Sequence, residues 1–175
     1  MSSQAIFAQK QKSQKVYTIE TTNAGKFSIS DNYVHEWLRF PSIEGESIFA
    51  DRLISHKPRH GRSTVLIFLS SWCIPCQNLM PEFMELYQRH SQIYSDILFI
   101  FTSDTPKDAQ GFAREYNLNA PAIIANADIL SKFNQPESPT IFIGDRWGWM
   151  TKRLRKMNRE SIKEADEFLT LISKG

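Results

Sequence analysis

The chain reads Ser70-Ser71-Trp72-Cys73-Ile74-Pro75-Cys76 where a continuous apolar run gives way to a pattern with helical period. The apolar run at 64–69 predicts a buried strand, and the segment from about 74 to 90 predicts a helix. Free N–H groups and the helix macrodipole favour an anion at the first turn of a helix. We therefore expect Cys73, which lies at that turn, to have a lowered thiol pKa and to act as a nucleophile.

Cys76 lies three residues after Cys73, on the same helix face and one turn deeper. This spacing lets Cys76 attack a mixed disulfide formed on Cys73, which releases the partner and closes a Cys73–Cys76 disulfide. Pro75 falls within the first turn, where its missing N–H costs little. Thiol–disulfide exchange is therefore the chemistry that this pair predicts.

Two other interpretations of the cysteine pair stay open. The pair could be half of a zinc site, but zinc needs four ligands, and the sequence has no second Cys pair and no His-x-x-x-His. The pair could also be two inert buried cysteines, which the strand-to-helix setting between Trp72 and Pro75 makes the weakest interpretation. The histidines available as ligands are His35, His56, His60 and His90.

Length and composition describe one globular domain. The chain has 175 residues and only two cysteines, so its core and not a set of cross-links must hold it together. Lys and Arg number 21 against 19 Asp and Glu, a net charge of +2 that predicts no nucleic-acid partner. No strictly apolar run is longer than five residues, as at 65–69, which is far below the roughly 20 residues that cross a bilayer, so we expect a soluble protein with no membrane span.

The N-terminal part predicts two segments ahead of the main domain. Residues 1–15 are rich in Gln, Ser and Lys and predict a flexible leader without the apolar centre of a secretory signal. Residues 16–36 predict a β-hairpin extension, because the β-rich runs 16–19 and 26–29 flank Asn23-Ala24-Gly25. Two locations stay open: the cytoplasm if the chain is complete as written, or the periplasm or another extracytoplasmic space if a signal or anchor has been removed.

The predicted main domain, 37–175, begins with a second pair of β-rich runs. Residues 37–40 and 47–49 flank Glu44-Gly45, and a helical turn is expected at 51–54. Short apolar runs then alternate with helical patterns, which indicates βαβ units with largely parallel strands. The connection at 144–148 is too short for a crossover helix, so the strands on either side of it are expected to form a hairpin. Strands are expected at 64–69, 97–101, 122–125, 140–143 and 149–151, and helices at 74–90, 106–117, 127–134 and 159–173.

The segment from Trp72 to Cys76 resembles the W-C-x-P-C motif of thioredoxin-fold oxidoreductases, particularly the TlpA/ResA-like branch. Pro81 matches the proline that kinks the active-site helix of that family, and 139–148 is similar to its P-T-x-F-x-I-D-x-x-G segment. The resemblance covers about 37–173. It implies an α/β, thioredoxin-like fold: a central mixed sheet flanked by helices, here with the N-terminal β-hairpin extension.

The resemblance also implies an activity and a site. It implies a thiol–disulfide oxidoreductase, acting as a reductase, with Cys73 and Cys76 as catalytic residues and no cofactor beyond their redox-active disulfide. Its proline is cis and lies against the cysteines, where the backbone of the preceding residue binds an extended partner segment. Protein disulfide or dithiol substrates, an upstream electron donor, a monomeric state and a periplasmic location are implied as well. The residues expected to bind substrate are Trp72, Ile74, Pro75, Ser138 and Pro139.

Two positions depart from the family pattern. An acid commonly lies three residues after the second cysteine in the TlpA/ResA-like branch, and this chain has Leu79 there. A buried Asp lies six residues before the first cysteine of thioredoxin, and this chain has Ile67. Cys76 therefore needs another proton acceptor, and a slow or unusually pH-dependent resolving step is our hypothesis.

Two rival functions were weighed against disulfide exchange. A thiol peroxidase would have a P-x-x-x-[TS]-x-x-C signature, which precedes neither cysteine. A redox-inactive module of the same fold would use the thiols as copper or zinc ligands, but the related copper carriers are expected to have C-x-x-x-C and a downstream His. This chain has C-x-x-C and no His after His90.

Features away from the cysteines carry further predictions. The basic cluster Arg153, Arg155 and Lys156 is expected to lie toward Cys73, either lowering its pKa or forming a solvated edge. Asp104 is expected to form an Asx turn or to cap the helix that starts near Pro106.

Two segments are expected far from the cysteines. The basic segment 56–62 is predicted to be a solvated loop about 20 Å away. Trp147 and Trp149 flank a hairpin tip that is predicted to be remote from the site, where core packing and a partner surface are equally open.

Overall fold

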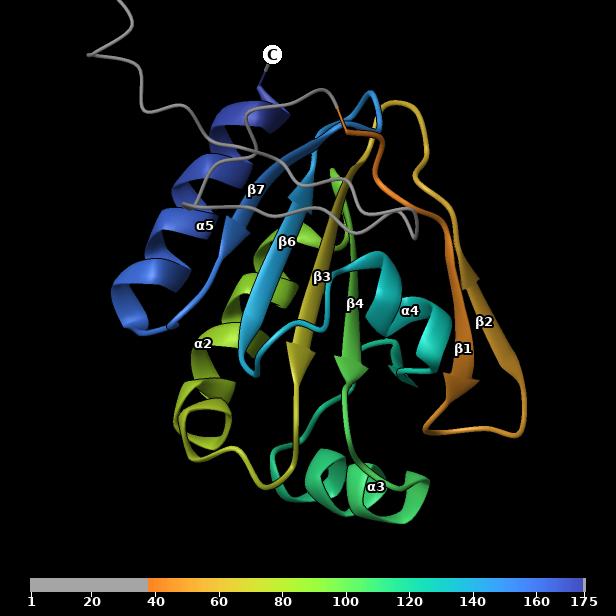
Figure 1. The fold of residues 1–175 in the computed structure, drawn as a ribbon. Helices are drawn as coiled ribbons and strands as arrows, with labels where there is room; N and C mark the ends of the chain where they lie inside the picture. Colours follow the sequence, from red (N-terminus) through yellow and green to blue (C-terminus); the bar gives the residue numbers. More distant parts are fainter. Residues whose placement is uncertain (1–37, 175) are drawn as a thin grey trace, which may run out of the picture.

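A mixed sheet of seven strands organises residues 38–174, the part of the chain that the computed structural model describes (Figure 1). The strand order is β2-β1-β5-β4-β3-β6-β7. β3 pairs in parallel with β4, and β4 with β5, whereas the other neighbours are antiparallel. The strands are β1 (Ile43–Ser47), β2 (Leu53–His56), β3 (Ser63–Leu69), β4 (Ser95–Phe101), β5 (Ala122–Ile124), β6 (Thr140–Gly144) and β7 (Met150–Leu154).

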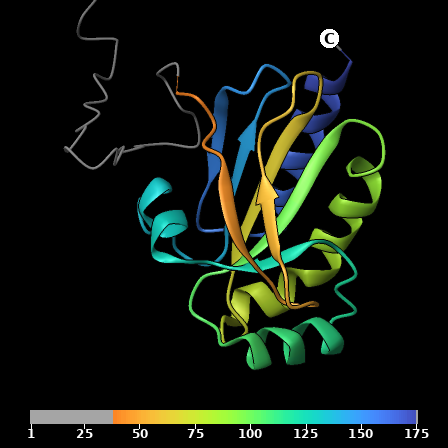
Figure 2. The ribbon, with the colours of Figure 1, turned by 90° about the vertical axis from the view of Figure 1, so that its right-hand side faces the viewer.

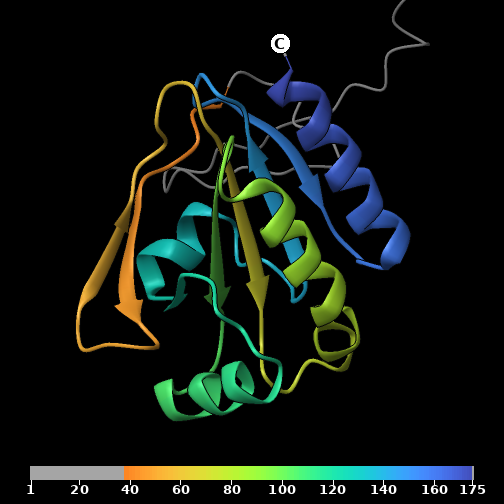
Figure 3. The same ribbon diagram turned by 180° about the vertical axis from the view of Figure 1, so that it is seen from behind.

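Helices cover both faces of this sheet. α2 (Ile74–His90) and α5 (Arg159–Ser173) lie side by side on one face, and α4 (Ala127–Lys132) lies on the other (Figures 2 and 3). α3 (Pro106–Glu115) lies at the end of the sheet where β3 and β4 finish. β3 is buried along its whole length because both of its faces are covered, which explains the continuous apolar run 65–69 within it.

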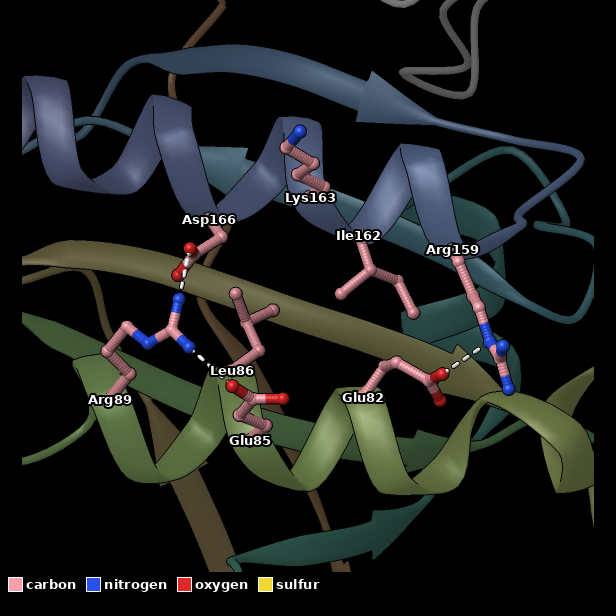
Figure 4. A pocket seen from close by; sticks show the side chains of 8 residues that line it. All are labelled: Glu82, Glu85, Leu86, Arg89, Arg159, Ile162, Lys163 and Asp166. Carbon is pink, nitrogen blue, oxygen red and sulfur yellow. Dashed lines mark hydrogen bonds and ion pairs between the residues drawn. The ribbon is translucent and has the colours of Figure 1, made fainter.

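Charged side chains bridge the outer edges of α2 and α5 (Figure 4). Arg159 Nε lies 2.6 Å from Glu82 Oε1, and Arg89 pairs with both Glu85 and Asp166. Below this layer the two helices share an apolar core that includes Leu86 and Ile162. α2 is thus held to α5 by an apolar contact with an ionic rim.

The expected pairing at the start of the domain is wrong. Glu44 and Gly45 lie inside β1 and not in a turn, β1 pairs with β2, and the expected helical turn at 51–54 overlaps the start of β2. The physical reason lies at Gly45, where a Cβ would come within 2.9 Å of Ile123 Cδ1 and of the Ile124 carbonyl oxygen. This glycine permits close packing of β1 against β5. Arg39 forms only an isolated bridge to Trp149.

The elements after residue 62 confirm the predicted thioredoxin-like order. α5 spans 159–173 as expected, and the other predicted elements from β3 onward agree within a few residues. The predicted leader, 1–15, and the predicted β-hairpin, 16–36, lie outside the described residues, as does Trp37. Within 38–174, no helix is both long enough and apolar enough to cross a membrane.

Candidate active site

Cys73 and Cys76 occupy the turn between β3 and the first turn of α2. Cys73 is the residue before the helix, and its Sγ accepts a hydrogen bond from the Cys76 N–H at 3.2 Å. The two residues form a disulfide with a Cα–Cα distance of 5.2 Å. Cys73 is 5% exposed and Cys76 is fully buried. The expected juxtaposition of the two sulfurs at a helix start is therefore present, and only one of them reaches the surface.

The loop before β6 lies directly against Cys73. The Ser138 carbonyl oxygen is 3.5 Å from Cys73 Sγ, and the Ser138–Pro139 peptide bond is cis. The pairing of β6 with β3 brings this loop to the cysteines, because Thr140 lies opposite Phe68. Residues that are 65 positions apart in the sequence thus form one site.

Exposed apolar side chains surround the nearly buried Cys73. Trp72 and Ile74 are each 67% exposed, and Pro75 is exposed as well. The Trp72 indole N–H donates a hydrogen bond to Ser103 Oγ at 3.1 Å, which orients the ring. A reactive sulfur within an apolar rim is suited to contact with another protein, because large apolar side chains are otherwise costly to leave in water.

Three hydroxyl groups meet beneath the loop of Ser138, and sequence reasoning missed this arrangement. Ser70 Oγ lies 2.8 Å from Thr102 Oγ1 and 3.0 Å from Ser138 Oγ, and the last two atoms are 3.0 Å apart. The group, which we call the hydroxyl triangle, joins the ends of β3 and β4 to the start of β6. It turns the Ser138 side chain inward, so the residue is held by its hydroxyl while its carbonyl faces Cys73. The sequence feature that could have indicated the triangle is a Ser or Thr close to each of the three strand ends.

Asp104 holds the turn that carries the cysteines. Its Oδ1 accepts hydrogen bonds from the Ser71 N–H, at 2.9 Å, and from the Ser71 hydroxyl. The expectation that Asp104 caps α3 is wrong, because Thr105 is the cap. The second carboxylate oxygen, Oδ2, is buried without a hydrogen-bond partner. Asp104 therefore places an incompletely satisfied negative group beside the residues that lead into Cys73.

The floor of the site is apolar. Ile67 is fully buried and Leu79 is 6% exposed, and both belong to the same packed cluster as Cys73 and Cys76. These are the two positions at which related proteins are expected to carry an acid. Packing against aliphatic side chains separates Cys76 from water.

The basic cluster does not act as one unit toward Cys73. β7 does end near the cysteines, because Leu154 pairs with Ile141. However, Arg153 is 5% exposed and its guanidinium lies 5.4 Å from the ring centroid of Phe142, in the core on the α4 side of the sheet. Burial, together with the charge of Arg155, lowers the pKa of Arg153 to about 10, and Glu137 opposes this shift. Arg153 thus belongs to the opposite face from α2, and the expected three-residue rim is divided.

A sheet of this topology with a Cys-x-x-Cys disulfide at the first turn of α2 defines a thioredoxin-fold thiol–disulfide oxidoreductase. The family model that matches the chain does so over residues 40–150. The chain belongs to the AhpC/TSA family.

Relatives identified by sequence carry names of the same kind. The chain is 29% identical over 122 residues to thiol-disulfide oxidoreductase ResA of Bacillus thuringiensis subsp. konkukian, an alignment that covers 69% of each chain. It is 25% identical over 131 residues to sporulation thiol-disulfide oxidoreductase A of Bacillus subtilis, covering 72% of this chain and 75% of that one. These names favour redox exchange over the metal-binding alternative. Within 38–174, no three His, Cys, Asp or Glu side chains are grouped so as to hold a metal ion.

Solved structures confirm the fold. A putative protein disulfide isomerase from Bacteroides thetaiotaomicron superposes with a TM-score of 0.71 at 19% identity, covering 84% of this chain and 96% of that chain. A thiol:disulfide interchange protein from Chlorobium tepidum gives a TM-score of 0.70 at 16% identity, covering 80% and 99%. The predicted thioredoxin-like architecture is thus shared over almost the whole of both neighbours.

Proposed function

We propose that the protein is a reductase of protein disulfides in which Cys73 is the nucleophile and Cys76 the resolving thiol. The observation that carries this assignment is the difference in exposure between the two sulfurs. Cys73 lies at the surface between Ser138 and the start of α2, whereas Cys76 is sealed in the core. Only the Cys73 sulfur is accessible from outside, so only Cys73 can attack an external disulfide.

The proposed reaction transfers two electrons from the dithiol form of the protein to a client. The Cys73 thiolate attacks one sulfur of the client disulfide, the client S–S bond breaks, and the leaving thiolate takes up a proton. Cys76 then loses its proton and attacks Cys73 Sγ, which releases the second client thiolate and forms the Cys73–Cys76 disulfide. An upstream dithiol donor restores the reduced pair and becomes a disulfide itself.

The client is proposed to bind as an extended segment. The Ser138 backbone, next to Pro139 and Cys73, would pair with the main chain of the client, and main-chain pairing provides affinity with little dependence on sequence. Trp72, Ile74 and Pro75 would contact side chains on either side of the client cysteine. Their exposure supports this role, since nothing in the described residues covers them.

We also place the protein outside the cytoplasm, in the periplasm or an equivalent space. Disulfide-bonded clients persist mainly in oxidising compartments, and a reductase of protein disulfides is of use where they form. Fractionation of the producing cells followed by detection of the full chain tests this location. Recovery with cytoplasmic markers alone would overturn it.

Trapping tests the assignment of the two thiols. A Cys76→Ser variant should accumulate a mixed disulfide with a peptide client that is supplied in its disulfide form. The Cys73→Ser variant should form no mixed disulfide and should lose insulin-reducing activity. A mixed disulfide on Cys76 in the Cys73→Ser variant would reverse the roles. Hydrogen peroxide supplied in place of the client should be consumed no faster than by the Cys73→Ser variant, and rapid consumption would support the peroxidase rival.

The reduction potential tests the direction of electron flow. Equilibration with glutathione should give a value near that of thioredoxin, about −270 mV. A value near the roughly −120 mV of strong oxidants would show that the protein donates its disulfide instead.

A further inference from the structure

Two loops and one bridging residue meet at the end of the sheet opposite the cysteines. The loop before β3, residues 57–62, lies beside the hairpin loop 145–149 (Figures 1 and 3). Arg39 bridges to Trp149 and lines a groove together with residues of both loops. This groove is lined by the exposed side chains of Arg39, Lys57, Arg59, His60 and Trp147. The sequence suggested a solvated basic loop and an unassigned tryptophan pair, and the structure joins them into one surface.

A third loop belongs to the same surface through Arg62. Arg62 donates hydrogen bonds to the carbonyl oxygens of Ile93, at 2.8 Å, and Ser91, at 3.0 Å. Ile93 is 61% exposed and Tyr94 is 48% exposed. We call the surface made by loops 57–62, 91–94 and 145–149 with Arg39 the basic face.

Positive charge is concentrated on the basic face. Within residues 38–174, two carboxylates contact this surface and both are engaged: Asp96 binds Arg59 and Arg62, and Asp145 accepts the N–H groups of Trp147 and Trp149. The five cations outnumber these two carboxylates by three, whereas the whole 175-residue chain carries only +2. The five cations are Arg39, Lys57, Arg59, Arg62 and Arg146.

Contacts with arginine side chains fix the position of the aromatic part of the basic face. Trp147 is 52% exposed at the tip of the β6–β7 hairpin, and the Arg146 guanidinium lies 4.7 Å from the centroid of its ring. Arg39 donates a hydrogen bond to the Trp147 carbonyl oxygen at 2.9 Å and lies 3.9 Å from the ring centroid of Trp149. The indole is thus presented outward by a braced loop.

We propose that the basic face binds the surface of an anionic phospholipid membrane. Cations interleaved with Trp, Tyr and a large aliphatic side chain match the headgroup layer, where cations meet anionic lipids and amphipathic rings lie at the boundary with the acyl chains. A small-molecule site would enclose its ligand, but the cationic lining here is exposed. A protein interface would have an apolar centre, whereas the apolar groups here are spread over two loops between cations.

This binding mode leaves the cysteines accessible. β3 runs for seven residues from Ser63, beside the basic face, to Leu69, just before the cysteine turn. At about 3.3 Å per residue the strand holds Cys73 roughly 20 Å from the basic face. A membrane-bound molecule would therefore present its Trp72 rim away from the lipid. The proposal does not depend on the direction or clients of the redox reaction.

Flotation of the full chain with lipid vesicles tests the proposal. The protein should float with vesicles of phosphatidylcholine mixed with phosphatidylglycerol but not with phosphatidylcholine alone. High salt should release it, because the Debye length falls from about 10 Å at 0.1 M to about 3 Å at 1 M. Lys57→Gln should lower the partition coefficient about fivefold, and Lys57→Gln with Trp147→Ser should lower it further.

A matched control separates the basic face from general surface effects. Lys163→Gln with Phe49→Ser removes one cation and one aromatic ring elsewhere, and Phe49, at 53% exposure, is exposed to the same degree as Trp147. This control should bind vesicles like the unmodified chain, and both double variants should keep full insulin-reducing activity. Vesicles of brominated lipid should quench Trp fluorescence less in Trp147→Phe than in the unmodified chain.

Four results would overturn the proposal. The first two are failure of the protein to float with anionic vesicles at low salt and equal flotation with neutral vesicles. The other two are an equal loss of vesicle binding in the Lys163→Gln with Phe49→Ser control and unchanged binding by the Lys57→Gln with Trp147→Ser variant. If the protein bound a DNA duplex as tightly as it binds anionic vesicles, the basic face would be a site for polyanions in general and not for membranes in particular.

Discussion

Ser70 Oγ and Ser138 Oγ lie 3.0 Å apart, and this contact joins the end of β3 to the residue whose carbonyl oxygen faces Cys73. Ser70 is fully buried, so water cannot replace the partner that its hydroxyl would lose. The hydroxyl triangle therefore sets the position of the backbone that the client is proposed to pair with.

Ser70→Ala should weaken both folding and client binding. Loss of the buried hydroxyl should lower the free energy of unfolding by about 1 kcal/mol, measured by urea denaturation. The Ser138 backbone should then be less well positioned, so KM for a protein client should rise while kcat changes little. Ser42→Ala, at an exposed position, serves as the control. An unchanged KM with reduced stability would leave the triangle a purely structural role.

Asp104→Asn should make the cysteine pair more oxidising. The change keeps an oxygen acceptor for the Ser71 N–H but removes a negative charge bound to Ser71, two residues before Cys73, whose sulfur is proposed to become a thiolate. The pKa of the Cys73 thiol in the reduced protein should fall, and the reduction potential should rise by about 30 mV, equal to about 1.4 kcal/mol. Glutathione equilibration measures the potential, with the exposed Glu115→Gln as the control. A fall in potential would contradict the electrostatic argument.

Leu79→Glu should speed the resolving step. An acid at this position could accept the proton of Cys76, which now lies among aliphatic side chains. The rate of insulin reduction, followed from about pH 6 to about pH 9, should rise about tenfold at the neutral end of the profile. Leu79→Gln has a similar size but takes up no proton. If the Gln variant gains as much as the Glu variant, or neither gains, proton transfer does not limit this step.

His56 should make the fold less stable in mild acid. Burial lowers the pKa of His56, the charge of Arg59 adds to this effect, and Asp96 opposes it. The unfolded chain therefore takes up a proton that the folded chain does not, and stability falls as the pH drops below the ordinary value of about 6.5. Urea denaturation at several pH values should show a smaller fall for His56→Gln than for the unmodified chain. His60→Gln, at an exposed position, should not reduce the fall.

Asp166→Ala should destabilise the contact between α2 and α5. Asp166 binds Arg89, and its Oδ1 lies 2.7 Å from Nε2 of His90, which is 5% exposed. Removing the carboxylate leaves a buried imidazole without this partner, at a cost of about 2 kcal/mol in the free energy of unfolding. Glu85→Ala breaks an exposed pair on the same arginine and should cost less than about 0.5 kcal/mol. Equal losses in the two variants would contradict this ranking.

Local patterns predicted most of the fold because each was consistent over a whole element. α5 follows one apolar stripe from Ile162 to Ile172 and ends one residue after that stripe. β1 and β2 were assigned wrongly because a glycine such as Gly45 is typical of turns. Its role in the structure is close packing against Ile123, which belongs to a strand about 80 residues away. A single glycine cannot distinguish these two roles in the sequence.

The cysteine pair was predictable because both residues lie in one short motif, and the family resemblance placed Ser138 and Pro139 beside it. The side-chain contacts that hold these residues in place were not predictable. Ser70, Thr102 and Ser138 come from three separate strand ends, and only the sheet order brings them together. The face of the sheet on which Arg153 lies depends on the pairing of β7 with β6, and the register of this pairing shifts between Ile143 and Gly144 of β6. Alternation along the sequence therefore could not predict the face of Arg153. Asp104 was predicted to form an Asx turn or a helix cap, both short-range roles, whereas its partner, Ser71, lies 33 residues earlier.

The unequal burial of the two sulfurs also constrains the order of events in the proposed cycle. Cys73 is the only sulfur of the pair at the surface, so the client and the electron donor must both react there. They cannot occupy the site together, and each must leave before the other binds. Turnover should therefore follow double-displacement kinetics, in which high concentrations of either partner inhibit the reaction by excluding the other.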